Sequence, residues 1–141
     1  MLNYKMSDLK GIDEKQVAQL LRGNVENTDE MMNLWNDPAR RLSITASTGL
    51  TDEQLTRLAS MARVARVKGV GPKYADLLVT AGVRGHKSLA TYTPETLVRR
   101  LGDVRAGRSL AGPLPTLAEV GAWFAELKPA VASHMATAKL A

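Results

Sequence analysis

The stretch VKGVGPKYADLLVTAGV, residues 67–83, decides the fold. Its two glycines, Gly69 and Gly71, flank an apolar valine, an arrangement typical of a tight turn. Pro72 follows at once and suits the first position of a helix, because the N–H that proline lacks would have no intrahelical partner there. Gly82 stands where a left-handed C-terminal cap is expected. The stretch therefore predicts a tight turn that leads into a short helix from Pro72.

The backbone of this turn, residues 68–73 and here called the central turn, also suggests a chemistry. Backbone N–H groups between two glycines have no side chain to shield them, and at a helix N-terminus they can hold an anion. Lys68 and Lys73 flank the position. A Gly-Val-Gly tripeptide is also a common way to make a plain tight turn, so both interpretations remain open on the motif alone.

Composition points to a single helical domain. The chain has 141 residues, abundant alanine and leucine, few aromatic residues and no alternating runs of Val, Ile and Thr, which favours an all-α fold. The lack of cysteine excludes a disulfide framework and thiolate metal sites, and it favours a reducing compartment such as the cytoplasm. No apolar run approaches the ~18 residues that a membrane span needs, so we expect no membrane insertion.

The net charge of +5 is divided unevenly along the chain. Residues 1–62 carry seven Lys and Arg against nine Asp and Glu, whereas residues 63–141 carry twelve against five, so the two parts have net charges of −2 and +7. Basic charge of this kind concentrates phosphate polymers, although arginines on solvated helix faces also produce it. The charge is compatible with an anionic partner without identifying one.

An internal repeat is the simplest account of the N-terminal part. Sliding the sequence by 58 positions pairs residues 9–12, here called the first turn, with residues 67–70, and it pairs Leu20-Leu21 with Leu78-Val79. In the first copy Asp13 and Glu14 replace a glycine and a proline, which is typical of a helix cap, and carboxylates there repel phosphate. We therefore expect repeats over residues 7–49 and 51–102 with at most one phosphate site.

Punctuation residues predict the remaining helix ends. Helices are expected to start at Thr28 as a cap, at Asp37-Pro38, at a capping box beginning with Thr51, and at Thr93-Pro94. Gly49 is expected to end the first repeat. The residues Met31, Met32 and Trp35 have helical spacing and are interpreted as core rather than as a ligand pocket.

The C-terminal part is predicted to close the domain. Gly102 is expected to stop the last helix of the second repeat, and residues 103–113 are then a Gly- and Arg-rich connection. Thr116 with Glu119 forms a capping box for a final helix over residues 116–128, which completes one domain over residues 1–128. The tail, residues 129–141, has weak periodicity.

These motifs together resemble the bacterial domain-of-unknown-function family 4332. The resemblance rests on residues 68–78 and 81–83, on Leu114-Pro115-Thr116-Leu117 and on Trp123, and it covers about residues 7–128. That family is similar to paired helix-hairpin-helix domains, which implies two helix-hairpin-helix repeats packed as one compact helical domain, a SAM/HhH-like fold. In DNA-binding hairpins of this kind a G-x-G turn holds a backbone phosphate. The resemblance thus assigns amide donors to Gly69, Val70 and Gly71, with Lys68 and Lys73 as auxiliary charges.

Three classes of function follow. The first is a non-enzymatic, sequence-tolerant binder of the double-stranded DNA backbone, in which Arg63, Arg66, Arg99 and Arg100 add electrostatic affinity. The second is a protein-interaction or scaffold module with no nucleic acid, in which the acidic and basic parts meet different partners or each other. An enzyme is not expected, because the histidines stand beside no catalytic motif and no metal-ligand or cofactor motif is present. A monovalent cation on the carbonyls of the central turn remains open.

Overall fold

The computed structural model describes residues 2–108 and 114–126, and the fold is all-α, as predicted. Within these ranges the only β pairing is an isolated bridge between Lys5 and Asn27. The helical elements in order are η1 (Met6–Asp8), α1 (Glu14–Arg22), α2 (Thr28–Trp35), α3 (Pro38–Thr48), α4 (Asp52–Ala65), α5 (Ala75–Thr80), α6 (His86–Leu89) and α7 (Pro94–Arg108). A further helix, here called the closing helix, occupies residues 117–126.

Most helix starts follow the predicted caps. The Asp37 side chain accepts from the Arg40 amide, and Pro38 takes the first position of α3. Thr51 and Gln54 form the predicted capping box of α4, with each side chain accepting from the other residue's amide. These contacts satisfy amides that would otherwise lack partners at a helix start. Gly49 ends α3 in the left-handed conformation, as predicted.

The start of α2 differs from the prediction. The cap is Asn27, whose side chain accepts from the Glu30 amide, and Thr28 is the first helical residue. Thr28 is fully buried, and its hydroxyl donates to the Asn3 side chain at 2.9 Å. The N-terminal segment therefore uses the hydroxyl that the sequence had assigned to the cap.

The predicted stop at Gly102 is wrong. The helix α7 continues to Arg108, so residues 103–108 are helical rather than a loop. Leu101 and Val104 are both buried, and continuing the helix keeps Val104 against the core. A glycine inside a helix costs about 1 kcal/mol relative to alanine, which this burial outweighs. The rest of the predicted connection and the tail lie outside the described residues.

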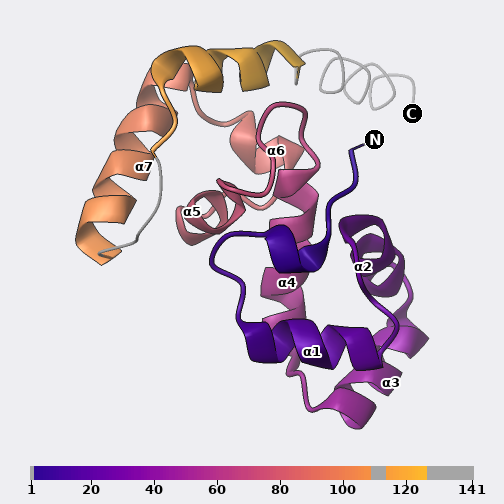
Figure 1. Cartoon of the computed structure of the whole chain (residues 1–141). Coiled ribbons are helices and arrows are strands. Elements are labelled where there is room, and N and C mark those ends of the chain that lie inside the picture. The colour runs from indigo at the N-terminus through magenta and orange to yellow at the C-terminus, as the bar shows by residue number, and fades with distance from the viewer. Residues whose placement is uncertain (1, 109–113, 127–141) are drawn as a thin grey trace.

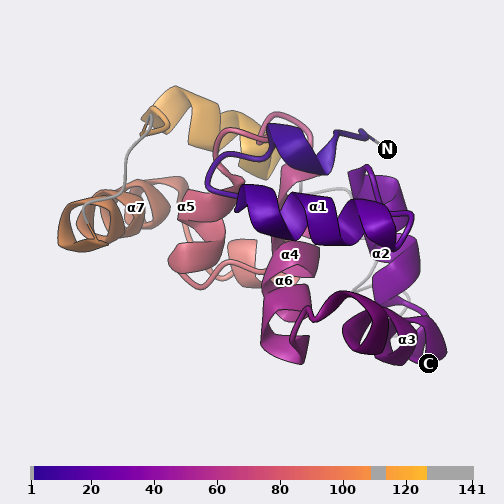
Figure 2. The same cartoon turned by 60° about the horizontal axis from the view of Figure 1, so that its bottom comes forward.

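The helix α4 lies at the centre of the molecule, and α2 and α5 pack against it (Figure 1). Its buried residues include Leu55, Leu58 and Ala62, which lie on the apolar stripe expected for its inner face. The predicted core residues Met31 and Met32 of α2 are also buried, and Trp35 packs partly buried against the same core. In both views α7 lies beyond α5 from α4 (Figures 1 and 2).

The first turn and the central turn are joined although about sixty residues separate them. The Lys10 amide donates to the Pro72 carbonyl at 3.0 Å. A Cβ added to Gly11, whose φ is +86°, would stand 2.7 Å from the Asp76 Cβ. Gly11 therefore permits a close approach that no other residue allows. The first turn packs directly on the segment that enters α5.

Candidate nucleic-acid interface

The central turn connects α4 to α5, and a tight turn is present there as the sequence predicts. Gly69 has φ +91° and Gly71 has φ +70°, both in the left-handed region. The helix that follows begins at Ala75, with Tyr74 before it, so the predicted start at Pro72 is wrong. Pro72 instead lies in the turn, where its carbonyl accepts from Lys10. The helix dipole therefore begins three residues later than the sequence suggested.

The three turn amides assigned to an anion are not equivalent. The Val70 amide donates to the Val67 carbonyl at 3.0 Å, and the Val70 side chain is buried. Its amide is thus occupied inside the turn and does not fit the donor role expected of it. In the described part of the chain, nothing accepts from the amides of Gly69 and Gly71. Gly71 is partly buried, and a Cβ added to it would meet only the Tyr4 hydroxyl, at 3.9 Å, so there is room for a side chain at this position.

The closing helix fixes the central turn from one side. The Trp123 indole N–H donates to the Gly69 carbonyl at 2.9 Å. The same ring packs against Tyr74, with ring centroids 5.4 Å apart, and both side chains are buried. The Tyr74 hydroxyl donates to Glu119 Oε2 at 3.0 Å. The turn is consequently a positioned element rather than a free loop.

Tyr74 and Glu119 shift each other's pKa in opposite directions. Burial raises the pKa of the Tyr74 phenol, and its hydrogen bond to Glu119 raises it further. The pKa of Glu119 is lowered, first by the hydrogen bond from the Thr116 amide and then by the one from Tyr74. The predicted box between Thr116 and Glu119 is present, with the Glu119 amide donating to the Thr116 hydroxyl at 3.1 Å. A neutral phenol and an ionised carboxylate therefore hold the closing helix to the turn.

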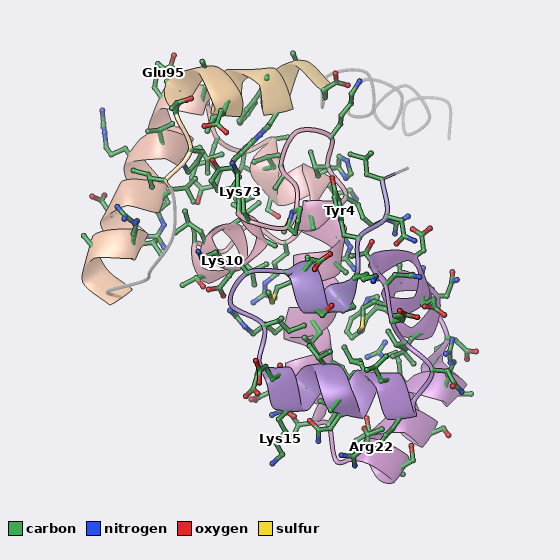
Figure 3. The ribbon with its side chains drawn as sticks, viewed as in Figure 1. Tyr4, Lys10, Lys15, Arg22, Lys73 and Glu95 are labelled. Carbon is green, nitrogen blue, oxygen red and sulfur yellow. The ribbon has the colours of Figure 1, made fainter. Side chains whose placement is uncertain are left out.

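Lysines surround the central turn. Lys68 and Lys73 are both exposed, as predicted for flanking charges. Lys10, which the site prediction left out, is also exposed and reaches this region because its amide bonds to Pro72. Figure 3 shows Lys10, Lys73 and Tyr4 around this junction, while Lys15 lies on α1, away from it. The 58-residue shift pairs Lys10 with Lys68, which is the signal that points to Lys10.

Two of the predicted arginines make contacts that join elements of the fold. Arg66 Nη2 lies 3.2 Å from Asp29 Oδ1, and only 18% of the Arg66 side chain is exposed. Arg63 Nη1 donates to the Arg84 carbonyl at 3.1 Å. Arg66 thus ties the end of α4 to α2, and Arg63 ties α4 to the segment before α6. Their charge contributes to the surface, but their side chains already have structural roles.

The other two predicted arginines belong to a different surface. Arg99 and Arg100 are exposed on α7, whose inner face is formed by Leu97, Leu101 and Val104. Because α7 lies beyond α5, the structure does not join them to the hydrogen-bonded cluster of the central turn (Figure 2). They form a second basic region rather than part of the same site.

A hollow of about 320 Å³ lies between α4 and α5, away from the central turn. It is lined by Asp52, Glu53, Thr56, Arg57, Ser60, Val79 and Arg84. Among the described residues, no group of three or more His, Cys, Asp or Glu side chains is placed to hold a metal ion. Over the same residues, no helix has both the length and the apolar character that crossing a membrane requires.

Fold and site together define an all-α domain built around a glycine turn between two helices. The chain belongs to the family described as Domain of unknown function (DUF4332), whose model matches residues 10–129. The predicted family resemblance is therefore confirmed. No curated protein and no solved structure matches the chain.

Proposed function

We propose that this domain is a non-enzymatic, sequence-tolerant module that binds the backbone of duplex DNA in the cytoplasm. One observation carries the proposal: the amides of Gly69 and Gly71 have no acceptor in the described chain, and the exposed Lys68 and Lys73 belong to the same turn, to which the amide of the exposed Lys10 is bonded. Backbone amides and lysines recognise phosphate oxygens and carry no base information. The site consists of Gly69, Gly71, Lys68, Lys73 and Lys10.

The hydrogen bonds support a tandem helix-hairpin-helix arrangement. Three backbone hydrogen bonds of the first copy recur 58 residues later in the second copy. The bond from the Ile12 amide to the Leu9 carbonyl recurs as Val70 to Val67. The bonds Asn24 to Leu21 and Val25 to Leu20 recur as Gly82 to Val79 and Val83 to Leu78. Left-handed residues recur at the same spacing, with Gly11 matching Gly69 and Asn24 matching Gly82. Two copies of one backbone pattern that meet at their turns are the arrangement proposed from the sequence.

The two copies are not equivalent as anion sites. In the first copy the Asp13 carboxylate accepts from the Lys15 amide, so a negative charge occupies the place that Gly71 holds in the second. The first turn therefore contributes Lys10 rather than a second set of amides. This supports one phosphate site per domain.

Salt dependence tests the proposal directly. The measurement is the fluorescence anisotropy of a labelled mixed-sequence duplex titrated with the full chain at several salt concentrations. With about three phosphate contacts, the association constant should fall roughly forty-fold between about 50 and 200 mM salt, since each contact releases close to one counterion. Affinity should not depend on the duplex sequence. Affinity that is independent of salt, or absent at low salt, contradicts the proposal.

A matched pair of variants at Gly71 separates charge from shape. Asn and Asp both tolerate the left-handed conformation, and there is room for a Cβ at this position. Gly71→Asp places a carboxylate beside the amides and should weaken DNA binding at least about tenfold, whereas the neutral Gly71→Asn should retain much more of it. Circular dichroism confirms that both variants fold. Equal binding by the two variants would argue against an anion at this turn.

A protein-interaction module is the second candidate, and one observation favours it. Leu21 on α1 and Leu42 on α3 are 52% and 76% exposed, and these two helices pack against each other. Both lie in the acidic part of the chain, away from the central turn. Sedimentation without nucleic acid tests the self-association form of this candidate, and a concentration-independent monomer contradicts that form. Gly71→Asp should leave such association unchanged.

A further inference from the structure

The closing helix brings two carboxylates to the central turn. Glu126 Oε1 lies 3.4 Å from Lys68 Nζ, with 46% of the Glu126 side chain and 71% of the Lys68 side chain exposed. Glu119 lies on the same helix, and its pKa is lowered first by the hydrogen bond from the Thr116 amide and to a smaller extent by the charge of Lys73. Lys68 therefore faces a carboxylate of this helix, whereas Lys73 Nζ lies 5.1 Å from the centroid of the Tyr74 ring.

Buried contacts of the closing helix fix the backbone positions of the residues that carry these carboxylates. Trp123, one turn before Glu126, is buried and bonded to the Gly69 carbonyl, and Val120 on the same helix is fully buried. The helix is thus anchored between Glu119 and Glu126 by its apolar face. An anchored helix keeps the Glu126 backbone beside Lys68 even when the ion pair itself opens.

A carboxylate at this distance competes with a phosphate for the same ammonium group. A lysine that is already paired with a carboxylate contributes less free energy to phosphate binding than an unpaired one. The carboxylate also stays nearby and repels the phosphate. Both side chains are exposed, so the pair is weak and can be displaced. The competition should therefore reduce affinity without abolishing binding.

We propose that Glu126 is a built-in competitor for the phosphate site, which keeps the DNA affinity of this domain low. The inference rests on the proposed function and adds a residue to it that acts against binding. Lys68 exchanges its carboxylate partner for a phosphate oxygen on binding, and no covalent step is involved. The closing helix then determines both the geometry of the central turn and its affinity.

Glu126→Gln is the variant that isolates this competition. Glu126 is exposed and makes no other described contact, whereas Glu119 also caps the closing helix and holds Tyr74. Glu53→Gln is the matched control, because it removes the same charge at the opposite end of α4, about 20 Å from the central turn for a helix of this length. Both variants change the net charge of the chain equally.

The experiment is the same duplex titration in anisotropy, with wild type and both variants at low and high salt. Glu126→Gln should bind about fivefold more tightly than wild type at low salt, and the difference should shrink as salt screens the charges. Glu53→Gln should change affinity much less. Wild-type binding with equal effects of the two variants overturns this inference and leaves the proposed function standing. Failure of all three proteins to bind overturns both.

Discussion

At the scale of single residues, Gly11 is a position where the fold tolerates a side chain poorly. It combines a left-handed backbone with direct packing on Asp76, which in turn is paired with Arg57. We predict that Gly11→Ala destabilises the protein by more than about 2 kcal/mol, because the strained conformation and the clash with Asp76 add together. Urea unfolding followed by circular dichroism measures this free energy.

Gly121→Ala is the control for that prediction. Gly121 lies inside the closing helix, and a Cβ there would meet nothing within 4 Å. Alanine favours a helix interior by up to about 1 kcal/mol over glycine, so this variant should be unchanged or slightly stabilised. If Gly11→Ala and Gly121→Ala lower the free energy of unfolding equally, the close approach of Gly11 to Asp76 is not the reason why glycine is needed at position 11.

At the scale of elements, the closing helix makes the free energy of unfolding depend on pH in the acidic range. The pKa of Glu119 lies below its ordinary value of 4.5 in the folded state, so its ionised form stabilises folding. That contribution is present above pH 4.5 and is lost as the pH falls through the lower folded value. Glu119→Gln removes it, so the variant's stability should fall less steeply below pH 4.5 than that of wild type.

Unfolding free energies measured in urea at several acidic pH values test this prediction. Contributions that the two proteins share cancel in the difference. The difference should be nearly constant above pH 4.5 and should decrease below it. Parallel curves over the whole range would show that the bonds from Thr116 and Tyr74 do not stabilise the ionised form.

The elements also show what the sequence predicts and what it does not. Caps such as Asp37 and Thr51 act locally, so the residues alone predicted them correctly. The starts of α2 and α5 depend on partners that are distant in the sequence. The Thr28 hydroxyl donates to the Asn3 side chain, and the Pro72 carbonyl accepts from the Lys10 amide. No local pattern contains those partners. The continuation of α7 past Gly102 likewise depends on the burial of Val104 against other elements.

The candidate site divides in the same way. The tight turn at Gly69 and Gly71 follows from local conformational preference, and the sequence predicted it; both glycines are left-handed in the structure. The occupied amide of Val70, the pairing of Arg66 with Asp29 and the arrival of Lys10 are tertiary features. Sequence spacing cannot distinguish a surface arginine from one that ties two helices together. The site that the structure supports is therefore smaller than the predicted one and richer in lysine.

At the scale of the whole molecule, one continuous core predicts one unfolding transition. The chain has two tryptophans, Trp35 packed against the core near α3 and Trp123 buried in the closing helix. Trp35→Phe leaves the second as the only indole, and Trp123→Phe leaves the first. In each variant the indole emission and the helical circular dichroism should change at the same urea concentration, because a single cooperative domain unfolds as a unit.

The two variants need not have the same stability, so the emission and the circular dichroism are compared within each variant. Trp123→Phe loses the hydrogen bond to Gly69, so both of its signals should change together at lower urea than in the wild type. A transition of the Trp123 emission that precedes the loss of helix would identify the closing helix as a separate unit.

The junction between the first turn and the central turn makes folding depend on the order of synthesis. A ribosome delivers Lys10 and Gly11 long before Pro72 and Asp76, which they contact. Trp123 is delivered later still. Contacts of high sequence separation form late and leave apolar surface uncovered in the nascent chain until their partners emerge. Completion of the chain through residue 126, rather than formation of its first helices, is therefore the event that closes the core.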